Sequence, residues 1–589
     1  MTIDRDPRRE YEQRQQARRR NVARFENREN RISILRLAAA IAFLIAAWAS
    51  LWRGAIGPRW LVVPALTFLA LVVIHDRISR LKWRAQRAVE FYEDGIARIE
   101  DRWIGRGQST EAWRSDSHLY AADLDIFGKA SLFELLSTAR MRSGEETLAA
   151  WLAGPAGRNE IVERQQAVEE LRNRVDLRED IAILGTSIRT SIHPEFLMKW
   201  GRSERVLNNR TMRIALPVLA SITIPLLFTS FWPYILAVDA AVGLFYRRRV
   251  RSVMEAVERP EKELSLLAQI LARIEREQFT SPRLVALRRA LDTDGLPPSR
   301  QIGRLARMMD MLNWRRNELF AVFSVFVFWA SQITFAVEAW RSRCGLKAVP
   351  WLNAAGEFEA LCALSGYAYE HPDDPFPEIV ERGPVFEGEE LKHPLVPAAQ
   401  CIPNSVNLGG SLQMLVVSGS NMSGKSTLLR TVGINAVLAL AGAPVRARSL
   451  RISPLEVGAT LRIQDSLQAG TSRFYAEIQR IHHIMERTKG PLPVLFLLDE
   501  VLHGTNSHDR AVGAEAIVKG LVGRGAIGLV TTHDLALARV AETLSPRAAN
   551  VHFEDEMIGG KMVFDYRMHP GVVRKSNALA LMRAVGLEV

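Results

Sequence analysis

The loop sequence GSNMSGKST, residues 419–427, constrains the fold more than any other part of the chain. It matches the pattern G-x-x-x-x-G-K-[ST] and lies between an apolar run at 414–418, which predicts a strand, and a helical pattern that begins at residue 427. The glycines let backbone N–H groups close around phosphates, and the start of the helix adds its dipole. We therefore expect ATP here, with Lys425 on the β- and γ-phosphates and Ser426 on Mg²⁺. The remaining nucleotide contacts that we expect in this loop are Gly419, Asn421, Gly424 and Thr427.

Two further apolar runs end in polar residues that suit hydrolysis. The run 492–498 is followed by Asp499 and Glu500, the pattern of a Walker B strand. Asp499 is expected to act on Mg²⁺ and Glu500 to polarise the attacking water. The run 526–530 is followed by TTHD, and its His533 would sense the γ-phosphate through a hydrogen bond, the alternative being an ordinary surface histidine. The predicted catalytic residues are thus Lys425, Glu500 and His533.

The pattern of apolar and polar residues changes near residue 385. Short apolar runs alternate with helical patterns from there to the end, which predicts an α/β domain with a largely parallel sheet over 385–589. A stretch with four prolines, residues 371–384, is the predicted linker into it. Upstream, residues 85–200 and 250–370 are amphipathic with few turn signals, and they predict two parts of a helical core.

Two apolar hairpins interrupt the helical patterns. The runs 34–52 and 60–74 predict a transmembrane hairpin over 34–75, preceded by a basic tail, residues 1–33, with ten arginines against six acidic residues. The runs 214–228 and 232–246 predict a second hairpin over 212–246. Arginines flank the open ends of both hairpins, so the positive-inside rule predicts a multi-pass protein of the inner membrane with its N-terminus, helical core and ATPase domain in the cytoplasm. The alternative is two buried hairpins of a soluble protein.

Other features leave choices open. Asp239 within the second hairpin is either a functional carboxylate or, as we favour, a helix-contact position. The apolar stretch 319–337 is expected to be a buried helix rather than a fifth span. The net charge of +12 suggests an anionic partner, nucleic acid or lipid, unless the arginines merely flank membrane helices. The three cysteines lack C-x-x-C spacing and indicate neither a disulfide framework nor a cysteine-rich metal site.

From residue 393 onward the chain resembles the MutS family of DNA mismatch-repair ATPases. The motifs that carry the likeness are KHPLV (392–396), GSNMSGKST (419–427), GTSRFYAEI (470–478), LLDEVLHGTNS (497–507), TTHD (531–534) and ANVHF (549–553). GTSRF stands where transporter ATPases carry LSGGQ, which disfavours a transporter. Upstream, LDIFGKASLFELL (124–136), TLAAWL (147–152) and QQAV (165–168) resemble the start of the family's helical lever.

The resemblance implies further roles. It implies that Ser472 reaches the nucleotide of an opposing subunit, so that a homodimer forms composite sites, and that the loop 504–507 crosses the dimer interface. His552 matches a position that packs on the adenine. The aromatic residue expected near Cys401 and Ile402 is missing, and His503 replaces the usual arginine. The family's N-terminal mismatch-reading domain has no counterpart within residues 1–85.

These observations predict an α/β P-loop (ABC-type) ATPase domain at the C-terminus, preceded by an all-α, lever-like domain with transmembrane helical hairpins. The expected function is a membrane-anchored, MutS-like ATPase that uses ATP and Mg²⁺ in a dimer-composite site. It would couple hydrolysis to DNA binding, directed at the DNA backbone, for mismatch repair or for sensing DNA structure. The alternative is a membrane-bound ATP switch that acts on a protein or lipid partner without DNA. A purely structural role is disfavoured because the nucleotide motifs are intact.

Overall fold

The computed structural model of the chain contains two compact units. Unit 1 comprises Met1–Trp103 and Asp176–Thr186, and unit 2 comprises Ile104–Val175 and Ser187–Val589. The structure describes residues 6–573 except 55–56, 108–112, 114, 116, 185–198, 204–209, 227–228, 231, 258–260, 293–294, 315–323, 325–326, 421–422, 462–472, 503–504, 534 and 559–560.

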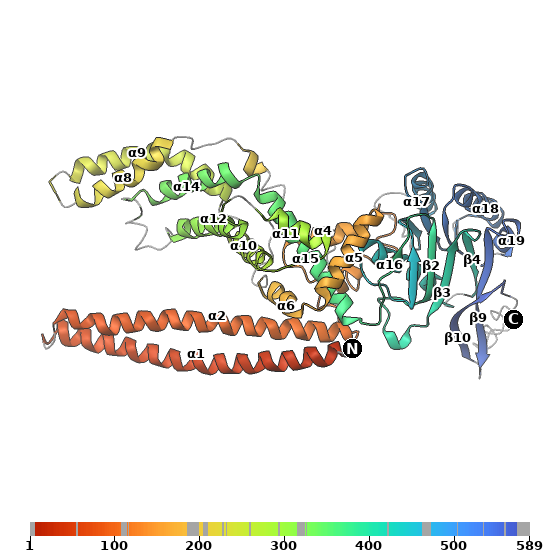
Figure 1. Ribbon diagram of the computed structural model, residues 1–589, viewed down its shortest axis with the longest axis horizontal. Helices are drawn as coiled ribbons and strands as arrows, with labels where there is room; N and C mark the ends of the chain where they lie inside the picture. Colours follow the sequence, from red (N-terminus) through yellow and green to blue (C-terminus); the bar gives the residue numbers. More distant parts are fainter. Residues whose placement is uncertain are drawn as a thin grey trace. The chain divides into compact units, whose positions relative to one another are not determined.

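Unit 1 is built on a long helical hairpin. Helix α1 spans Pro7–Leu51, the short helix η1 spans Pro58–Leu61, and α2 spans Val62–Ile99. The two long helices lie side by side (Figure 1). Asp6 caps α1 by accepting a hydrogen bond of 3.0 Å from the backbone N–H of Arg8, and proline at the first helical position starts the helix without losing a bond.

From Pro7 the basic segment 1–33 is helical, and α1 continues through it into the apolar run without a break. Ion pairs between residues four apart, such as Arg14–Glu10 at 3.0 Å, support the helix, and no helix breaker stands between residues 8 and 51. In the same way α2 continues past the predicted end of the hairpin at residue 75, and past residue 85, where we expected the helical core to begin.

The basic end of the hairpin packs against α6, Val175–Leu184, most of which belongs to unit 1. Tyr11 and Tyr92 are fully buried and meet edge to face, with ring centroids 5.4 Å apart. Arg18 forms an ion pair of 2.8 Å with Glu179 of α6, and the Tyr92 hydroxyl donates a hydrogen bond to the same carboxylate. Aromatic packing and partly buried ion pairs thus hold this end of the hairpin, a segment that the sequence predicted to be a solvated or helical tail.

The apolar end of the hairpin is exposed. The helical stretches Pro7–Leu51 and Arg59–Ile99 are long and apolar enough to cross a membrane, and the most apolar window of each is not buried anywhere within the structure. Ile34 and Leu44, for example, are 68% and 66% exposed. A membrane location of these residues stays a prediction.

The N-terminal part of unit 2 is helical. Its helices are α3 (Leu132–Leu136), α4 (Arg142–Ala153), α5 (Arg158–Arg172), α8 (Arg210–Leu226), α9 (Trp232–Val257), α10 (Glu261–Glu275), α11 (Pro282–Ala290), α12 (Pro298–Asn313), α14 (Trp329–Cys344) and α15 (Ala348–Glu370). Helix α15 is buried on almost every side, packs against α4 and α5, and forms the centre of this part.

The second predicted hairpin corresponds to α8 and α9. Among the described residues it contains only a short apolar helix, Thr211–Thr223, that is below the length of a membrane span. Pro217 and Pro225 lie inside α8, and α9 continues eleven residues past the predicted end, to Val257. Asp239 lies in α9. Within the predicted helix 319–337, α14 begins at Trp329, and its residues Thr334, Phe335 and Val337 are buried.

The C-terminal part of unit 2 is an α/β domain with two sheets. The six-stranded sheet has the order β10-β9-β4-β8-β7-β6, and all of its neighbouring strands are parallel except β10, which runs antiparallel to β9. Its strands are β4 (Met414–Ser418), β6 (Glu456–Thr460), β7 (Val494–Leu498), β8 (Ile527–Thr532), β9 (Ala548–Ile558) and β10 (Lys561–Pro570). The predicted α/β domain with a largely parallel sheet is thus present.

Helices cover both faces of this sheet. Residues of α17 (Arg473–Arg487), α18 (Ser507–Gly523) and α19 (Leu535–Thr543) share a buried core with Phe496 and Leu498. The opposite face packs against α16 (Lys425–Ala441), whose Gly433 lies against Leu497. Because successive side chains of a strand point to opposite faces, the three central strands β4, β8 and β7 are buried throughout, as their unbroken apolar runs predict.

A second, four-stranded sheet has the order β1-β5-β2-β3. Its strands are β1 (Glu378–Ile379), β5 (Ser449–Ile452), β2 (Val385–Leu391) and β3 (Asn404–Gly409), with the short helix η4 (Ala398–Gln400) between β2 and β3. Strand β1 pairs in parallel with β5. Part of the stretch 371–384 that we expected to be a linker is therefore a strand of the α/β domain, and the domain begins before residue 385.

Candidate nucleotide-binding site

The predicted site residues meet at the carboxyl ends of the parallel strands. Val417 of β4 lies opposite Thr531 of β8, and Leu498 of β7 lies opposite Val530 of β8. The residues that follow these strands therefore emerge at one edge of the sheet, where open α/β sheets bind their ligands. Gly419, Asp499 and His533 are the first residues after β4, β7 and β8.

The loop between β4 and α16 requires glycine at both of its ends. Gly419 has a φ of 149° and Gly424 a φ of 105°, conformations that residues with a Cβ rarely adopt. A Cβ on Gly419 would also lie 2.9 Å from the Ser423 hydroxyl. Gly424 directly precedes the first turn of α16, so the helix begins at Lys425 with its N–H groups facing the loop. Asn421 lies outside the described residues.

Lys425 is folded back over this loop. Its Nζ donates hydrogen bonds of 2.8 Å to the carbonyl oxygens of Gly419 and Ser420, and the residue is only 5% exposed. Burial lowers the pKa of Lys425, while the nearby carboxylates of Glu500 and Asp499 act in the opposite direction. A buried ammonium group held inside a ring of loop backbone suits the recognition of an anion.

The hydroxyl of Ser420 supports the same conclusion. Among the residues that the structure describes, this hydroxyl is buried without a hydrogen-bond partner. Buried polar atoms are normally paired, and an unpaired one in a glycine-ended loop next to a lysine fits a loop that binds phosphate oxygens.

Ser426 and Asp499 form the predicted metal site. The Ser426 hydroxyl donates a hydrogen bond of 2.6 Å to Oδ2 of Asp499. The backbone N–H of Asp499 donates to the carbonyl of Thr460 at the end of β6, at 3.0 Å, which fixes the residue across the edge of the sheet. A hydroxyl and a carboxylate oxygen are the ligands that Mg²⁺ prefers beside phosphate oxygens and water. The two side chains therefore fit the ion.

Glu500 and His533 lie in contact beside this pair. His533 Nε2 meets Oε1 of Glu500, and Nδ1 lies 3.3 Å from the carbonyl oxygen of Gly419. Glu500 itself has a φ of 50°, and its backbone N–H donates a hydrogen bond of 3.0 Å to the hydroxyl of Thr531. The structure thus brings the residues after all three predicted strands together, and their assigned roles stay predictions.

The remaining predicted contacts are more scattered. His552 lies in β9 opposite Ser418 of β4, is 8% exposed, and makes hydrogen bonds to the Gly571 carbonyl and to Glu554. Thr427 lies in the first turn of α16 with an exposed side chain. Ser472, which the resemblance assigns to the nucleotide of an opposing subunit, lies outside the described residues, as do His503 and Gly504.

The sequence did not point to two residues that belong to the site. Thr531 was visible in TTHD, but only the register of β7 against β8 shows that its hydroxyl lies between Asp499 and Glu500. Tyr566 of β10 lies against the start of α16, since a Cβ on Gly424 would be 3.2 Å from its ring. No local pattern around Tyr566 predicted this contact.

The site is also joined to the helical part of unit 2. Arg430 of α16 forms an ion pair of 3.0 Å with Asp125, and Gly433 of the same helix packs against Leu124. Asp123 accepts hydrogen bonds from the backbone N–H of Leu461, at 2.7 Å, and from Arg480, at 3.0 Å. The segment 123–125 therefore contacts both the helix that starts in the loop and the region that follows β6.

Comparison with known proteins agrees with this architecture. The family model MutS domain V matches residues 415–588. The DNA mismatch repair protein MutS of Natronomonas pharaonis is 31% identical over 239 residues, and that of Desulfosudis oleivorans is 31% identical over 248 residues; each alignment covers 40% of this chain. The Endonuclease MutS2 of Thermus thermophilus is 33% identical over 213 residues, or 35% of this chain.

Each alignment covers 27% of the relative's own length, so this chain matches about a quarter of these proteins. The matched region begins in β4 and contains the loop, the strand ends and the helices described above. Residues 415–588 match MutS domain V, and it is this part of the chain that belongs with the MutS family.

Proposed function

We propose that this protein binds ATP with Mg²⁺ at the edge of the six-stranded sheet and hydrolyses it. The observation that carries the proposal is the hydrogen bond of 2.6 Å between Ser426 and Asp499, which joins the start of α16 to the end of β7. It forms beside a buried lysine inside a glycine-ended loop, in a MutS domain V. These groups are the ones that a nucleotide triphosphate and its metal ion require.

In this proposal different side chains of the site have different roles. Lys425 and the N–H groups at the start of α16 would hold the phosphates, and Ser426 and Asp499 would hold Mg²⁺, which neutralises phosphate charge when it is bound. Glu500 would orient and polarise the attacking water. His533, in contact with both Glu500 and the Gly419 carbonyl, would report to the loop whether the γ-phosphate is present.

The catalytic part of the proposal is tested by ATP turnover of the full chain. Glu500→Gln keeps the size of the side chain and removes the base, so we expect turnover to fall at least about a hundredfold while ATP binding persists. Glu515→Gln on α18 is the matched control, because Glu515 is itself exposed and pairs with exposed Lys519, four residues away. Equal turnover in the wild type and in Glu500→Gln would contradict the assignment.

We further propose that two chains form composite sites, with Ser472 of one chain on the nucleotide of the other. The resemblance of GTSRF to the family's signature segment supports this. Ser472→Ala should then lower turnover without affecting ATP binding to the isolated chain. Addition of catalytically dead Glu500→Gln protein should restore part of the activity of Ser472→Ala, because each mixed dimer would contain one complete site. A strictly monomeric, active enzyme would contradict the proposal.

The proposed location is the inner membrane, with the α/β domain in the cytoplasm. The exposed apolar windows of α1 and α2 support it, as does the basic character of the helix ends that flank them. Carbonate extraction followed by flotation tests this point. Release of the full chain into the soluble fraction would contradict membrane insertion.

The coupled activity that we favour is DNA binding directed at the backbone. It is supported by the net charge of +12 and by family relatives that are named DNA mismatch repair proteins. Binding of a DNA duplex by the full chain in detergent should weaken steeply with salt, because lysine and arginine displace counterions from phosphates. The second candidate, an ATP switch without DNA, is favoured by the exposed apolar hairpin, and an absence of DNA binding even at low salt would select it.

A further inference from the structure

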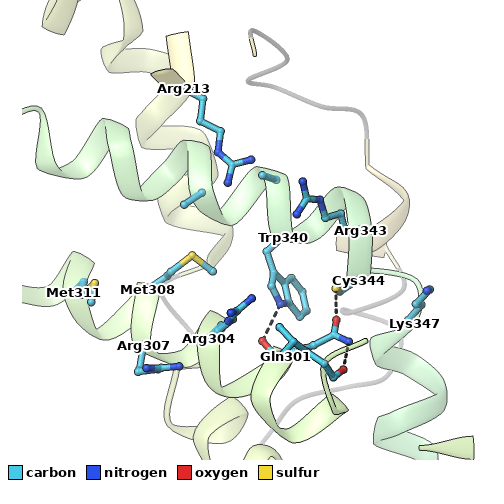
Figure 2. Close-up of a pocket in the computed structure, with 13 residues that line it drawn as sticks. Arg213, Gln301, Arg304, Arg307, Met308, Met311, Trp340, Arg343, Cys344 and Lys347 are labelled. Atoms are coloured by element: carbon cyan, nitrogen blue, oxygen red, sulfur yellow. Dashed lines mark hydrogen bonds between the residues drawn. The ribbon is translucent and has the colours of Figure 1, made fainter. Parts of the chain in front are cut away.

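A cavity of about 620 Å³ lies between helices α8, α12 and α14, in the helical part of unit 2. Its described lining carries five basic side chains from three helices and the segment after α14. They are Arg213, Arg304, Arg307, Arg343 and Lys347. Figure 2 shows them around the indole of Trp340, with Arg213 on a different helix from Arg304 and from Arg343. None of them belongs to the nucleotide-binding site.

The charge of this cavity is unbalanced. No aspartate or glutamate is among its described lining residues, and none of the five cations forms an ion pair within the part of the chain that the structure describes. Two neighbouring cavities differ, because acidic residues line them. Asp310 lies there with Arg276, Arg300 and the shared Arg307 in one, and Glu275 and Asp292 lie with Arg276 and Arg300 in the other. The five cations are exposed to solvent, but without a counter-charge they still repel one another and produce a positive potential, which a bound anion relieves.

The floor of the cavity is apolar and held in place. Trp340 is 8% exposed, and its Nε1 donates a hydrogen bond of 2.8 Å to the Gln301 carbonyl. The Gln301 side chain is engaged as well, because it accepts a bond of 2.6 Å from Cys344 Sγ and donates one of 2.6 Å to the Leu296 carbonyl. Met308 and Ala339 complete the apolar surface. A site for an inorganic ion needs no such floor, whereas a ligand that carries hydrocarbon next to its charge does.

The surroundings point to a lipid as the source of that ligand. Arg213 directly precedes an exposed aliphatic stripe on α8, formed by Ile214, Val218 and Ile222, which are 71%, 53% and 49% exposed. These residues are four apart, so they lie on one face of the helix. Arginine next to an exposed apolar stripe is typical of the interface between membrane and cytoplasm.

We propose that this cavity binds the phosphate headgroup of an anionic phospholipid. Arg304 and Arg343 hold the phosphate from opposite helices, because a guanidinium group matches phosphate oxygens with two parallel hydrogen bonds. Trp340 and Met308 contact the glycerol and the first carbons of the acyl chains. The inference rests on the membrane attachment proposed above, and it is independent of ATP hydrolysis.

The test uses the full chain, purified in a neutral detergent, and counts bound lipids by native mass spectrometry. The wild type should retain phosphatidylglycerol at least about tenfold better than phosphatidylcholine, because both lipids carry a phosphate but the five basic side chains repel the choline cation of the second. Arg304→Gln with Arg343→Gln should reduce phosphatidylglycerol to the level of phosphatidylcholine. The matched control removes two exposed arginines outside the cavity, by Arg289→Gln with Arg300→Gln, and should keep the preference.

A second variant separates the cavity from general surface charge. Ala339→Leu leaves every charge in place and fills part of the cavity, so it should also abolish the preference for phosphatidylglycerol. Retention unchanged in Ala339→Leu would overturn the proposal in favour of non-specific attraction. Circular dichroism shows whether the double arginine variant folds. If it does not, two other variants still decide the question. One is Ala339→Leu, and the other combines Arg304→Lys with Arg343→Lys and should keep part of the preference.

Two further experiments test whether the bound phosphate comes from a source other than a lipid. Displacement of phosphatidylglycerol by soluble glycerol phosphate at equal concentration would show a site for a free phosphate ester and overturn the lipid assignment. Loss of DNA binding in the double arginine variant with unchanged lipid retention would overturn it in favour of nucleic acid.

Flotation and ATP turnover of the same variants should equal those of the wild type. If the wild-type chain floats with membranes but shows no lipid preference, this inference alone is contradicted. If the chain does not float with membranes, the proposed membrane attachment is contradicted.

Discussion

The hydroxyl of Thr531 on β8 donates a hydrogen bond to Oδ1 of Asp499, the first residue after β7. The same hydroxyl oxygen accepts a hydrogen bond of 3.0 Å from the backbone N–H of Glu500. One threonine on the neighbouring strand thus fixes both acidic residues of the proposed site. It leaves Oδ2 of Asp499 directed at Ser426, and it supports a Glu500 backbone in the left-handed region.

Thr531→Val should therefore weaken the site although Thr531 contacts neither proposed ligand. The change keeps the shape of the side chain but leaves the Glu500 N–H and one Asp499 oxygen without their partner, at a cost of about 1–3 kcal/mol. We expect ATP turnover to fall about tenfold and the Mg²⁺ concentration for half-maximal turnover to rise. Thr531→Ser keeps the hydroxyl and should retain most of the activity. An unchanged Mg²⁺ dependence in Thr531→Val would contradict this account.

The ion pair between Arg430 and Asp125 should couple the α/β domain to the helical part of unit 2. Their side chains are 16% and 33% exposed, so solvent screens the pair only in part. A double-mutant cycle with Arg430→Gln and Asp125→Asn, measured by chemical unfolding, should give a coupling free energy of about 0.5–1.5 kcal/mol. The exposed pair Lys519–Glu515 is the control and should give about 0.3 kcal/mol. Equal coupling in both cycles would show that the Arg430 contact is an ordinary surface pair.

Two helical glycines should respond in opposite ways to alanine. A Cβ on Gly433 of α16 would lie 2.7 Å from side-chain atoms of both Leu124 and Leu497, so Gly433→Ala should lower the free energy of unfolding by about 1–3 kcal/mol. Gly523, the last residue of α18, has no atom within 4 Å of such a Cβ. Gly523→Ala should leave stability unchanged or raise it by up to about 1 kcal/mol. The thermal midpoints of the two variants test this, and a stabilised Gly433→Ala would contradict the close packing of α16.

Glu359 should make stability depend on pH. It is fully enclosed in α15, and burial raises the pKa of its carboxyl to about 8, although the backbone N–H groups of Arg140 and Met141 donate to it at 3.1 and 3.0 Å. The unfolded carboxyl has a pKa of about 4.3, so between about pH 4.3 and 8 the folded chain holds a proton that the unfolded chain has released. Its contribution to stability is complete below about pH 4.3 and is lost as the pH rises towards 8, by at most about 1.4 kcal/mol per unit.

Glu359→Gln removes this titration, but its amide keeps only one oxygen for two N–H groups that donate to separate carboxyl oxygens. The variant should therefore be less stable than the wild type near pH 5, and the difference should shrink or reverse near pH 8, where only the wild type loses stability. Thermal unfolding at both pH values measures the difference. A difference between the two proteins that stays the same at both pH values would argue against a buried neutral carboxyl.

The sequence predicted the strands of the α/β domain well. The run 414–418 is β4 at its predicted bounds, and the runs before Asp499 and His533 differ from β7 and β8 by at most two residues at either end. Strands buried on both faces are unbroken apolar runs, and the polar residues at their ends mark where burial stops. The polarity of residues 1–33, by contrast, allowed either a solvated or a helical tail, because exposed sides of a long helix and a solvated segment have the same composition.

The sequence by itself determined the order of the motifs, the α/β character of the C-terminal domain and the likeness to the MutS family. Local patterns suffice for these, because glycine at positive φ, a strand's apolar run and a helix start are properties of a few neighbouring residues. Only the tertiary structure decided that His533 contacts both Glu500 and Gly419, that Thr531 joins the two acidic residues, and that Asp125 meets Arg430. These contacts depend on strand register and on how α16 packs, which arise from distant parts of the chain and leave no local pattern in it.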